Sequence, residues 1–161
     1  MSTARTSRAF TLIELIAVIV VLALLSAVAI PKFFDWRTRA QVTSTAASWK
    51  VLTRAVGQYM MDNRETAPPN VNDGSMPPQL NPYLSNTDFE RTPAVGGFWD
   101  YDEWSGFGGG GAGLTASVSI TQSTAPQSTF QLIDAAVDDG NLNTGAVFYL
   151  TAYPRYTWRV R

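Results

Sequence analysis

The chain contains no cysteine and no histidine among its 161 residues. Without cysteine it has neither disulfides nor a thiol nucleophile, and without histidine it lacks the commonest zinc ligand and the Ser-His and Cys-His hydrolytic pairs. Charge is also scarce, with 12 Lys and Arg against 13 Asp and Glu. Nucleic-acid-binding surfaces normally show a basic excess. We therefore expect no enzymatic centre, no organic cofactor and no nucleic-acid partner.

The most informative stretch is the apolar run from Phe10 to Ile30, in which only three residues are polar. These are Thr11, Glu14 and Ser26. A helix of this length rises by roughly 31 Å, which is about the thickness of a bilayer's hydrocarbon core. The sequence therefore predicts a membrane-spanning helix, with Pro31 directly after it.

A short polar leader, Met1–Ala9, precedes this run and carries Arg5 and Arg8 but no acid. The positive-inside bias places such a leader in the cytoplasm and the rest of the chain outside it. Glu14 lies one turn inside the run, where a carboxylate costs a few kcal/mol unless it is paired. It is therefore either an acid tolerated at the membrane interface or one half of a charge pair.

These features resemble the type IV pilins and the pseudopilins of type II secretion. The resemblance is carried by the sequence Arg-Ala-Phe-Thr-Leu-Ile-Glu-Leu at residues 8–15, by the apolar run and by Pro31. It implies that a prepilin peptidase cuts between Ala9 and Phe10 and then N-methylates Phe10. Ala9 stands where the family usually has glycine, so the side chain before the cut remains small.

The resemblance also implies that Glu14 of one subunit meets the Phe10 amine of a neighbour when the helices stack into a fibre. In a medium of low dielectric an unpaired charge is costly, so this pair would select the axial register. Phe10, Glu14 and Pro31 are therefore the predicted assembly residues. A rival interpretation is an ordinary secretory signal, cut after the apolar run near the A-x-A at Ala27–Ala29. The polar leader Met1–Ala9, which runs directly into the sequence Phe-Thr-Leu-Ile-Glu-Leu, argues against it.

The helical pattern continues beyond Pro31 to about Asn63. Apolar residues recur there at spacings of three and four, which predicts a buried stripe on one face of Val42, Ala46, Trp49, Leu52, Val56 and Met60. We expect one long helix, bent or loosened at Pro31, because proline disturbs a helix interior. Phe33, Phe34 and Trp36 suit an aromatic belt at the membrane interface, and the nearby cations Lys32, Arg37 and Arg39 suit lipid headgroups.

The remaining sequence predicts a small antiparallel β-sheet head, so the expected fold class is α+β with a pilin-like long N-terminal helix. The expected division is a cleaved leader at 1–9, a transmembrane and assembly helix at 10–31, an amphipathic helix at 32–63, and a connector and sheet at 64–161. The connector, up to about Pro93, reads as irregular. Strands are expected at 98–102 and, half buried, at 114–121, with a flexible glycine-rich hairpin connection at 106–113 and a terminal hairpin within 146–160.

Two further features of the head concern its helix and its acids. Ser128 and Gln131 have the spacing of a capping box, which predicts a short helix ending near Asp139 and Gly140. The acids Asp100, Asp102 and Glu103 are expected on a solvated or edge-protecting face.

The stretch from Asp138 to Gly145 is the one candidate ion site in the sequence. Asp139, Asn141 and Asn143 alternate as oxygen ligands do in a calcium loop, and Asp138 lies beside them. Leu150 stands where an EF-hand would have its bidentate glutamate, so an EF-hand is excluded. Major pseudopilins resemble this chain and hold calcium in a late loop of the head. The two open interpretations are a calcium site and a polar turn.

Two classes of function remain. The first is a structural subunit that forms a homopolymer or a copolymer with other pilin-like chains, after contact with prepilin peptidase and an inner-membrane assembly platform. The second is a membrane-tethered periplasmic binding module. Within the first class, the absence of a C-terminal cysteine pair favours a type II secretion pseudopilin over a type IV pilus subunit for adhesion, motility or DNA uptake. The expected location is the bacterial inner membrane, with the head in the periplasm, and then the assembled filament.

Overall fold

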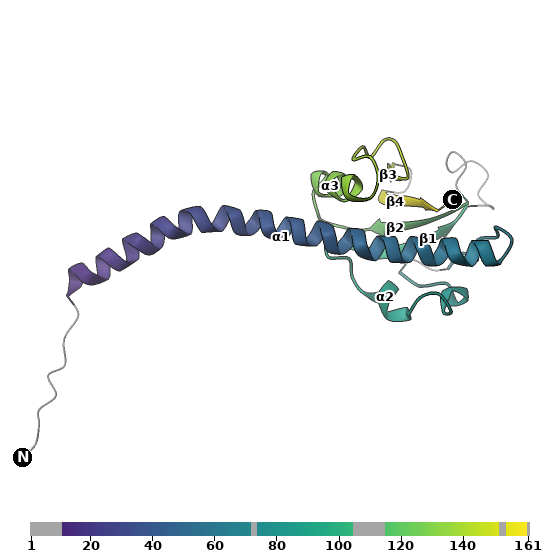
Figure 1. Cartoon of the computed structure of the whole chain (residues 1–161), viewed down its shortest axis with the longest axis horizontal. Helices are drawn as coiled ribbons and strands as arrows, with labels where there is room; N and C mark the ends of the chain where they lie inside the picture. The colour runs from purple at the N-terminus through teal and green to yellow at the C-terminus, as the bar shows by residue number, and fades with distance from the viewer. Residues whose placement is uncertain (1–10, 72–73, 105–114, 152–153, 161) are drawn as a thin grey trace, which may run out of the picture. The chain divides into compact units, whose positions relative to one another are not determined.

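The computed structural model describes residues 11–71, 74–104, 115–151 and 154–160. It contains the helices α1 (Leu12–Asp62), η1 (Pro78–Leu80), α2 (Asn86–Glu90) and α3 (Gln127–Val137), and the strands β1 (Phe98–Glu103), β2 (Ala116–Thr121), β3 (Val147–Leu150) and β4 (Arg155–Val160) (Figure 1). The chain separates into two compact units, Met1–Thr38 and Arg39–Arg161, which are described separately below. The predicted α+β class is confirmed.

The described part of the first unit is helical from Leu12 onward. Its large apolar side chains are exposed from Leu12 to Trp36. Pro31 lies inside α1, and the helix continues past it as the pattern predicted. Within the described residues, this stretch has no buried face.

The second unit is built on a four-stranded antiparallel sheet with the strand order β1-β2-β4-β3. The predicted aromatic strand near 98–102 and the predicted terminal hairpin are both present as β1 and as β3–β4. One face of the sheet is aromatic and aliphatic. In register across the strands, Tyr101 lies opposite Val118, and Trp158 lies opposite both Val118 and Val147.

The C-terminal part of α1 packs on that face through the predicted stripe. All six predicted stripe residues are buried: Val42, Ala46, Trp49, Leu52, Val56 and Met60. Trp49 lies at the centre, with its ring 6.0 Å from Trp99 and 5.8 Å from Trp158. Its Nε1 donates to the backbone carbonyl of Val118 at 2.9 Å, so this large side chain is buried with its polar atom satisfied.

The other face of the sheet corrects two predictions. β2 was expected to be half buried, but all six of its residues are buried. Trp104 covers part of the polar face and donates from Nε1 to Ser117 Oγ at 2.9 Å. Asp100 was expected to be solvated, yet its side chain is only 1% exposed and pairs with Arg155, which also pairs with Asp102. A buried charge persists because this partner neutralises it.

Two more predictions about the head are corrected. α3 begins at Gln127 with Pro126 as its N-cap and no side-chain cap, so the expected capping box from Ser128 is wrong. The connector is not simply irregular, because it forms η1 and α2 and buries Leu80, Leu84 and Phe89 in the core. The expected positive φ at Gly140 is confirmed at 79°. The glycine-rich connection at 106–113 lies outside the described residues.

Candidate functional site

The start of α1 carries the first candidate site. Ala9 and Phe10, the predicted cleavage and methylation residues, lie outside the described residues. Thr11 directly precedes the helix and Glu14 lies in its first turn. Glu14 Oε2 accepts hydrogen bonds from the Thr11 backbone N–H at 2.9 Å and from Thr11 Oγ1 at 2.8 Å. The Glu14 N–H faces Thr11 Oγ1 at 3.4 Å, so the two residues cap each other.

This helix start was visible in the sequence but was not identified there. Thr-Leu-Ile-Glu at residues 11–14 has the Ser/Thr-x-x-Glu spacing of a capping box. The sequence pattern alone left Glu14 as either an acid tolerated at the membrane interface or one half of a charge pair with a neighbouring subunit. The structure shows that its own chain already gives it two donors.

The apolar surface that follows Glu14 is extensive. Within the described residues, α1 is the one helix long and apolar enough to cross a membrane, judged by length and composition. None of its most apolar window is buried by the rest of the chain. Phe33, Phe34 and Trp36, the predicted aromatic belt, are likewise exposed. A surface of this size needs lipid or another protein to cover it.

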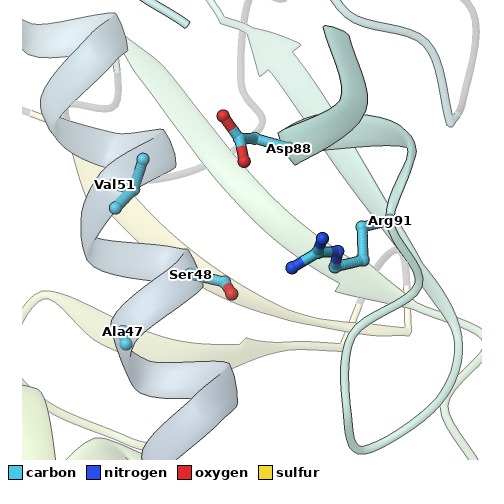
Figure 2. Close-up of a pocket in the computed structure, with 5 residues that line it drawn as sticks. All are labelled: Ala47, Ser48, Val51, Asp88 and Arg91. Carbon is cyan, nitrogen blue, oxygen red and sulfur yellow. The ribbon is translucent and has the colours of Figure 1, made fainter. Parts of the chain in front are cut away.

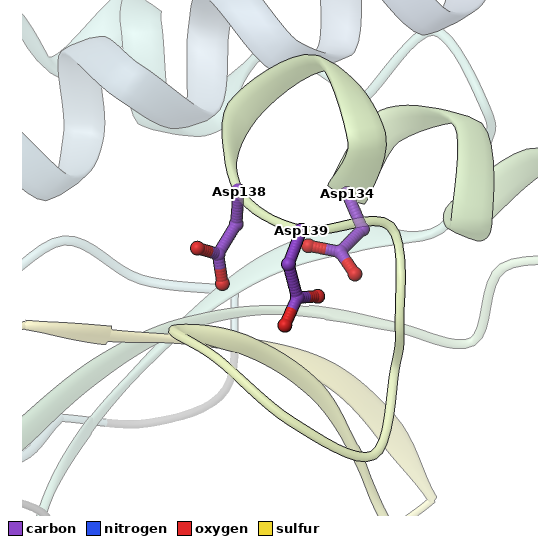
Figure 3. Close-up of side chains that lie close together, drawn as sticks. All are labelled: Asp134, Asp138 and Asp139. Carbon is purple, nitrogen blue, oxygen red and sulfur yellow. The ribbon is translucent and has the colours of Figure 1, made fainter.

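The second candidate site lies where α3 runs into the loop before β3 (Figure 3). Carboxylate oxygens of Asp134, Asp138 and Asp139 lie within 4.8 Å of one another. Oxygen ligands of one Ca²⁺ lie about 2.3–2.6 Å from the ion, so the three groups are close enough together to be candidate ligands of one ion. Asp138 and Asp139 were predicted as ligands. Asp134 was not, although its i, i+4 spacing to Asp138 on a helix was a signal that could have found it.

Local hydrogen bonds fold the loop around these acids. Asp138 Oδ2 accepts from the backbone N–H of Ala146 and, at 3.4 Å, from that of Val147. Asp139 accepts from the Asn141 N–H at 2.8 Å and from the Thr144 hydroxyl at 2.7 Å. These bonds hold both carboxylates on the inner side of the loop, at the end of α3.

Asn141 and Asn143, the other two predicted ligands, bond to each other. Asn141 Oδ1 accepts from the Asn143 backbone N–H and Nδ2, both at 3.2 Å. Gly145 has φ of +78°, and a Cβ there would lie 2.0 Å from Asp138 Oδ2. Only glycine therefore lets this loop close on the Asp138 carboxylate.

Asp134 is the unusual member of the cluster. Its side chain is fully buried, and within the described part of the chain neither carboxylate oxygen has a hydrogen-bond partner. Burial raises its pKa to about 6, and the charges of Asp139 and Asp138 add to the rise. The pKa of Asp139 is lowered, chiefly by the Thr144 hydroxyl and then by the Asn141 N–H. The cluster thus contains one buried acid whose oxygens lie beyond normal hydrogen-bond geometry of any donor in the described residues.

A groove between α1 and α2 shows a different chemistry (Figure 2). Ala47, Ser48 and Val51 of α1 line one side, and Asp88 and Arg91 line the other. The groove is open, and its two charged residues have opposite signs. It offers no convergent set of groups for a particular ligand.

Two comparisons find similarity to known proteins. The family described as the prokaryotic N-terminal methylation motif matches residues 4–30. Two fimbrial proteins of Pseudomonas aeruginosa are each 33% identical to the chain over 61 residues. That match covers 38% of this chain and 40% of each relative, so it spans well under half the length of these proteins.

No solved structure matches the chain. The methylation motif covers the start of the chain and the apolar first part of α1, and the fold is a long N-terminal helix with a small antiparallel sheet. The chain therefore carries the prokaryotic N-terminal methylation motif and, over part of its length, is similar to type IV pilin-like fimbrial proteins.

Proposed function

We propose that the chain is a structural subunit of a pilus-like filament, anchored and then polymerised through the first part of α1. The observation that carries this proposal is the exposed apolar helix that begins at Leu12 and carries Glu14 in its first turn, within the residues matched by the methylation motif. Lipid covers such a surface before assembly, and neighbouring α1 helices cover it afterwards. A tether alone would not need an acid in this position.

In this proposal a peptidase removes residues 1–9 on the cytoplasmic side and methylates the new amine of Phe10. The head then lies in the periplasm, because the two leader arginines hold the N-terminus in the cytoplasm. Glu14 pairs with the Phe10 amine of an adjacent copy. Inside a bundle of apolar helices, a subunit that docks out of register leaves both charges unpaired, which is costly. The pair therefore selects the correct axial register between neighbouring subunits.

Glu14→Leu tests the proposal. The variant should insert into the membrane and lose its leader as the parent does, but it should form no ordered filaments. Glu14→Gln is the matched control for shape, because it keeps an oxygen acceptor but has no charge. It should also fail to form ordered filaments. Mass spectrometry of the mature chain should find an N-methylated Phe10. Normal filaments from Glu14→Leu would overturn the assignment.

Two filaments are candidates. The fimbrial likeness favours a surface pilus, whereas the absence of cysteine favours the pseudopilus of type II secretion, since many adhesive pilins carry a C-terminal cysteine pair. We favour the pseudopilus. Deleting the chain should then trap secreted proteins in the periplasm while leaving surface fibres intact. The opposite pattern, with lost fibres and normal secretion, would identify a surface pilus subunit.

We also propose that the loop after α3 binds calcium. The donor set fits a hard cation, because it consists of three carboxylates that converge at the end of α3. The specific support is Asp134, a buried carboxylate whose two oxygens lack partners in the described part of the chain. A bound divalent ion would neutralise this charge and fix α3 against the loop.

Thermal unfolding of the chain in detergent, with calcium or EDTA, tests this site. Millimolar calcium should raise the melting temperature of the parent but not that of Asp134→Asn. Asp88→Asn, an exposed acid outside the cluster, is the control and should respond like the parent. The absence of any shift in the parent would remove the calcium proposal and leave the filament proposal untouched.

A further inference from the structure

The end of the apolar run carries a ring of exposed side chains around α1. We name it the collar, and it consists of Lys32, Phe33, Phe34, Trp36 and Arg37. All five residues are exposed, and the rings of Phe33 and Phe34 lie edge to face with their centroids 6.4 Å apart. Within the described residues, neither cation of the collar forms an ion pair. Both charges are therefore left for a partner from outside the chain.

The position of the collar along α1 sets its depth in a bilayer. The stretch Leu12–Ile30 rises by roughly 28 Å, which is close to the thickness of the hydrocarbon core. The collar begins two residues after this stretch, so it lies at the level of the lipid headgroups when the stretch spans the membrane. Aromatic rings favour this level, because one side of the ring meets acyl chains and the other meets water.

Each cation of the collar lies one helical turn from an aromatic side chain. Lys32 and Trp36 are four residues apart on α1, and so are Phe33 and Arg37. The two pairs lie on different sides of the helix, because successive residues are turned by about 100°. In each pair the ring can stay at the acyl boundary while the long charged side chain reaches a phosphate group.

The charge of the collar region is opposite in sign to that of the head. The stretch Lys32–Arg37 carries two cations and one acid, Asp35, whereas residues 40–161 carry seven Lys and Arg against eleven Asp and Glu. An anionic membrane would therefore repel the head and attract the collar. The positive-inside bias does not account for these cations, because the proposed orientation places them outside the cytoplasm. They fit a negatively charged partner at the depth of the headgroups.

We propose that the collar binds anionic phospholipid, with Lys32 and Arg37 on the phosphate groups and the three rings at the acyl boundary. Phosphatidylglycerol keeps its negative charge, whereas the choline of phosphatidylcholine compensates its phosphate, so the collar selects the first lipid over the second. This inference rests on the membrane anchoring in the proposed function and adds a lipid class to it. Its consequence is an anchor whose strength depends on the charge of the lipid.

Lipid selectivity is measured on the full chain in vesicles that contain no assembly machinery. Because the chain has no native cysteine, Ile30→Cys carries a single fluorophore directly before the collar. Its quenching by brominated phosphatidylglycerol and by brominated phosphatidylcholine is compared in vesicles made of both lipids. The ratio gives the enrichment of the anionic lipid next to the collar, and carbonate extraction checks that each chain is inserted.

Three variants change the charge around the collar or away from it. Lys32→Gln combined with Arg37→Gln, the collar variant, removes both cations and keeps long polar side chains. Arg54→Gln combined with Arg64→Gln is the matched control, because it removes two exposed cations from the second unit. Asp35→Asn changes the charge in the opposite direction, since it removes the one acid beside the collar.

The parent should enrich phosphatidylglycerol about fivefold or more, as expected for a net positive charge at an anionic surface. The collar variant should bring this enrichment close to one, and Asp35→Asn should raise it above the parental value. The matched control should behave like the parent. High salt should weaken the enrichment in the parent, because the charges lie at the boundary with water.

Equal quenching of the parent by both lipids would overturn the inference and would indicate that the cations serve a protein partner instead. The same loss of enrichment in the matched control as in the collar variant would also overturn it. If the collar variant did not insert, Asp35→Asn would decide, since an unchanged or lowered enrichment there contradicts the inference.

Glu14→Leu separates this inference from the filament proposal. If Glu14→Leu forms normal filaments while the parent selects the anionic lipid, the filament function fails and the role of the collar stands. If the parent shows no lipid selectivity while Glu14→Leu forms no filaments, only the role of the collar fails.

Discussion

Both parts of α1 carry large apolar side chains, but only the second part has them buried within the chain. Before Thr38 the apolar side chains stay exposed, whereas the stripe from Val42 to Met60 is buried on the sheet. The difference lies in the sequence pattern, since the first part is apolar on every side and the second only on one. A helix that is apolar all round needs a partner from outside the chain, and a one-sided helix finds its partner inside it.

The largest expected change in stability comes from comparing two tryptophans of α1, one buried and one exposed. Trp49→Ala should destabilise the head by about 3–5 kcal/mol, because it removes a fully buried ring and leaves Val118 without its indole donor. Trp36→Ala is the matched control, since Trp36 is 67% exposed and should leave the free energy of unfolding unchanged. Denaturant unfolding of the full chain in detergent measures both. Equal effects would contradict the division of α1 into two parts.

Two valines sharpen the comparison because their exposure is nearly the same. Val21 is 54% exposed and Val51 is 48% exposed. Val21→Lys should cost about 2.5–3.5 kcal/mol in apparent membrane insertion, because the charge enters hydrocarbon. Val51→Lys should change stability by no more than about 0.5 kcal/mol, because that side chain faces water.

Membrane insertion is followed by carbonate extraction, and head stability by unfolding in detergent. Val21→Lys should affect extraction alone. If Val21→Lys and Val51→Lys behaved alike in both measurements, the first part of α1 would not be surrounded by lipid.

Periodicity predicted the parts of the fold that depend on neighbours along the chain. The stripe through Trp49, the passage of α1 through Pro31 and the β3–β4 hairpin all follow from local spacing. The burial of Asp100 does not, because its partner Arg155 lies 55 residues away. α3 also shows the limit of a local pattern, since a proline N-cap replaced the expected serine box.

The candidate sites also divide into one that local sequence predicts and one that only the folded chain brings together. The methylation motif and Glu14 are a contiguous stretch, so the sequence alone identified them. Asp134 lies in the amphipathic helix α3 and becomes a candidate ligand only because Asp138 and Asp139 lie close to it in the folded chain. The loop closure that does this depends on backbone bonds from Ala146 and Val147, which no spacing rule encodes.

Asp134 resembles the exposed part of α1 in one respect, since within the described residues it has no partner for its polar atoms. Its substitution gives the smallest expected change in stability. Its pKa of about 6 lies above the ordinary value of 3.8, so the folded state binds its proton more tightly than the unfolded state. Its contribution therefore favours folding at low pH and is lost as the pH rises from about 4 to about 6.

In EDTA, Asp134→Asn should remove this fall in stability and should be more stable than the parent at pH 7 by about 1–2 kcal/mol. Asp88→Asn should keep the parental profile, since that acid is exposed. Denaturant unfolding between pH 4 and 7 measures all three chains, and a parental slope in Asp134→Asn would mean that the buried carboxylate is satisfied after all.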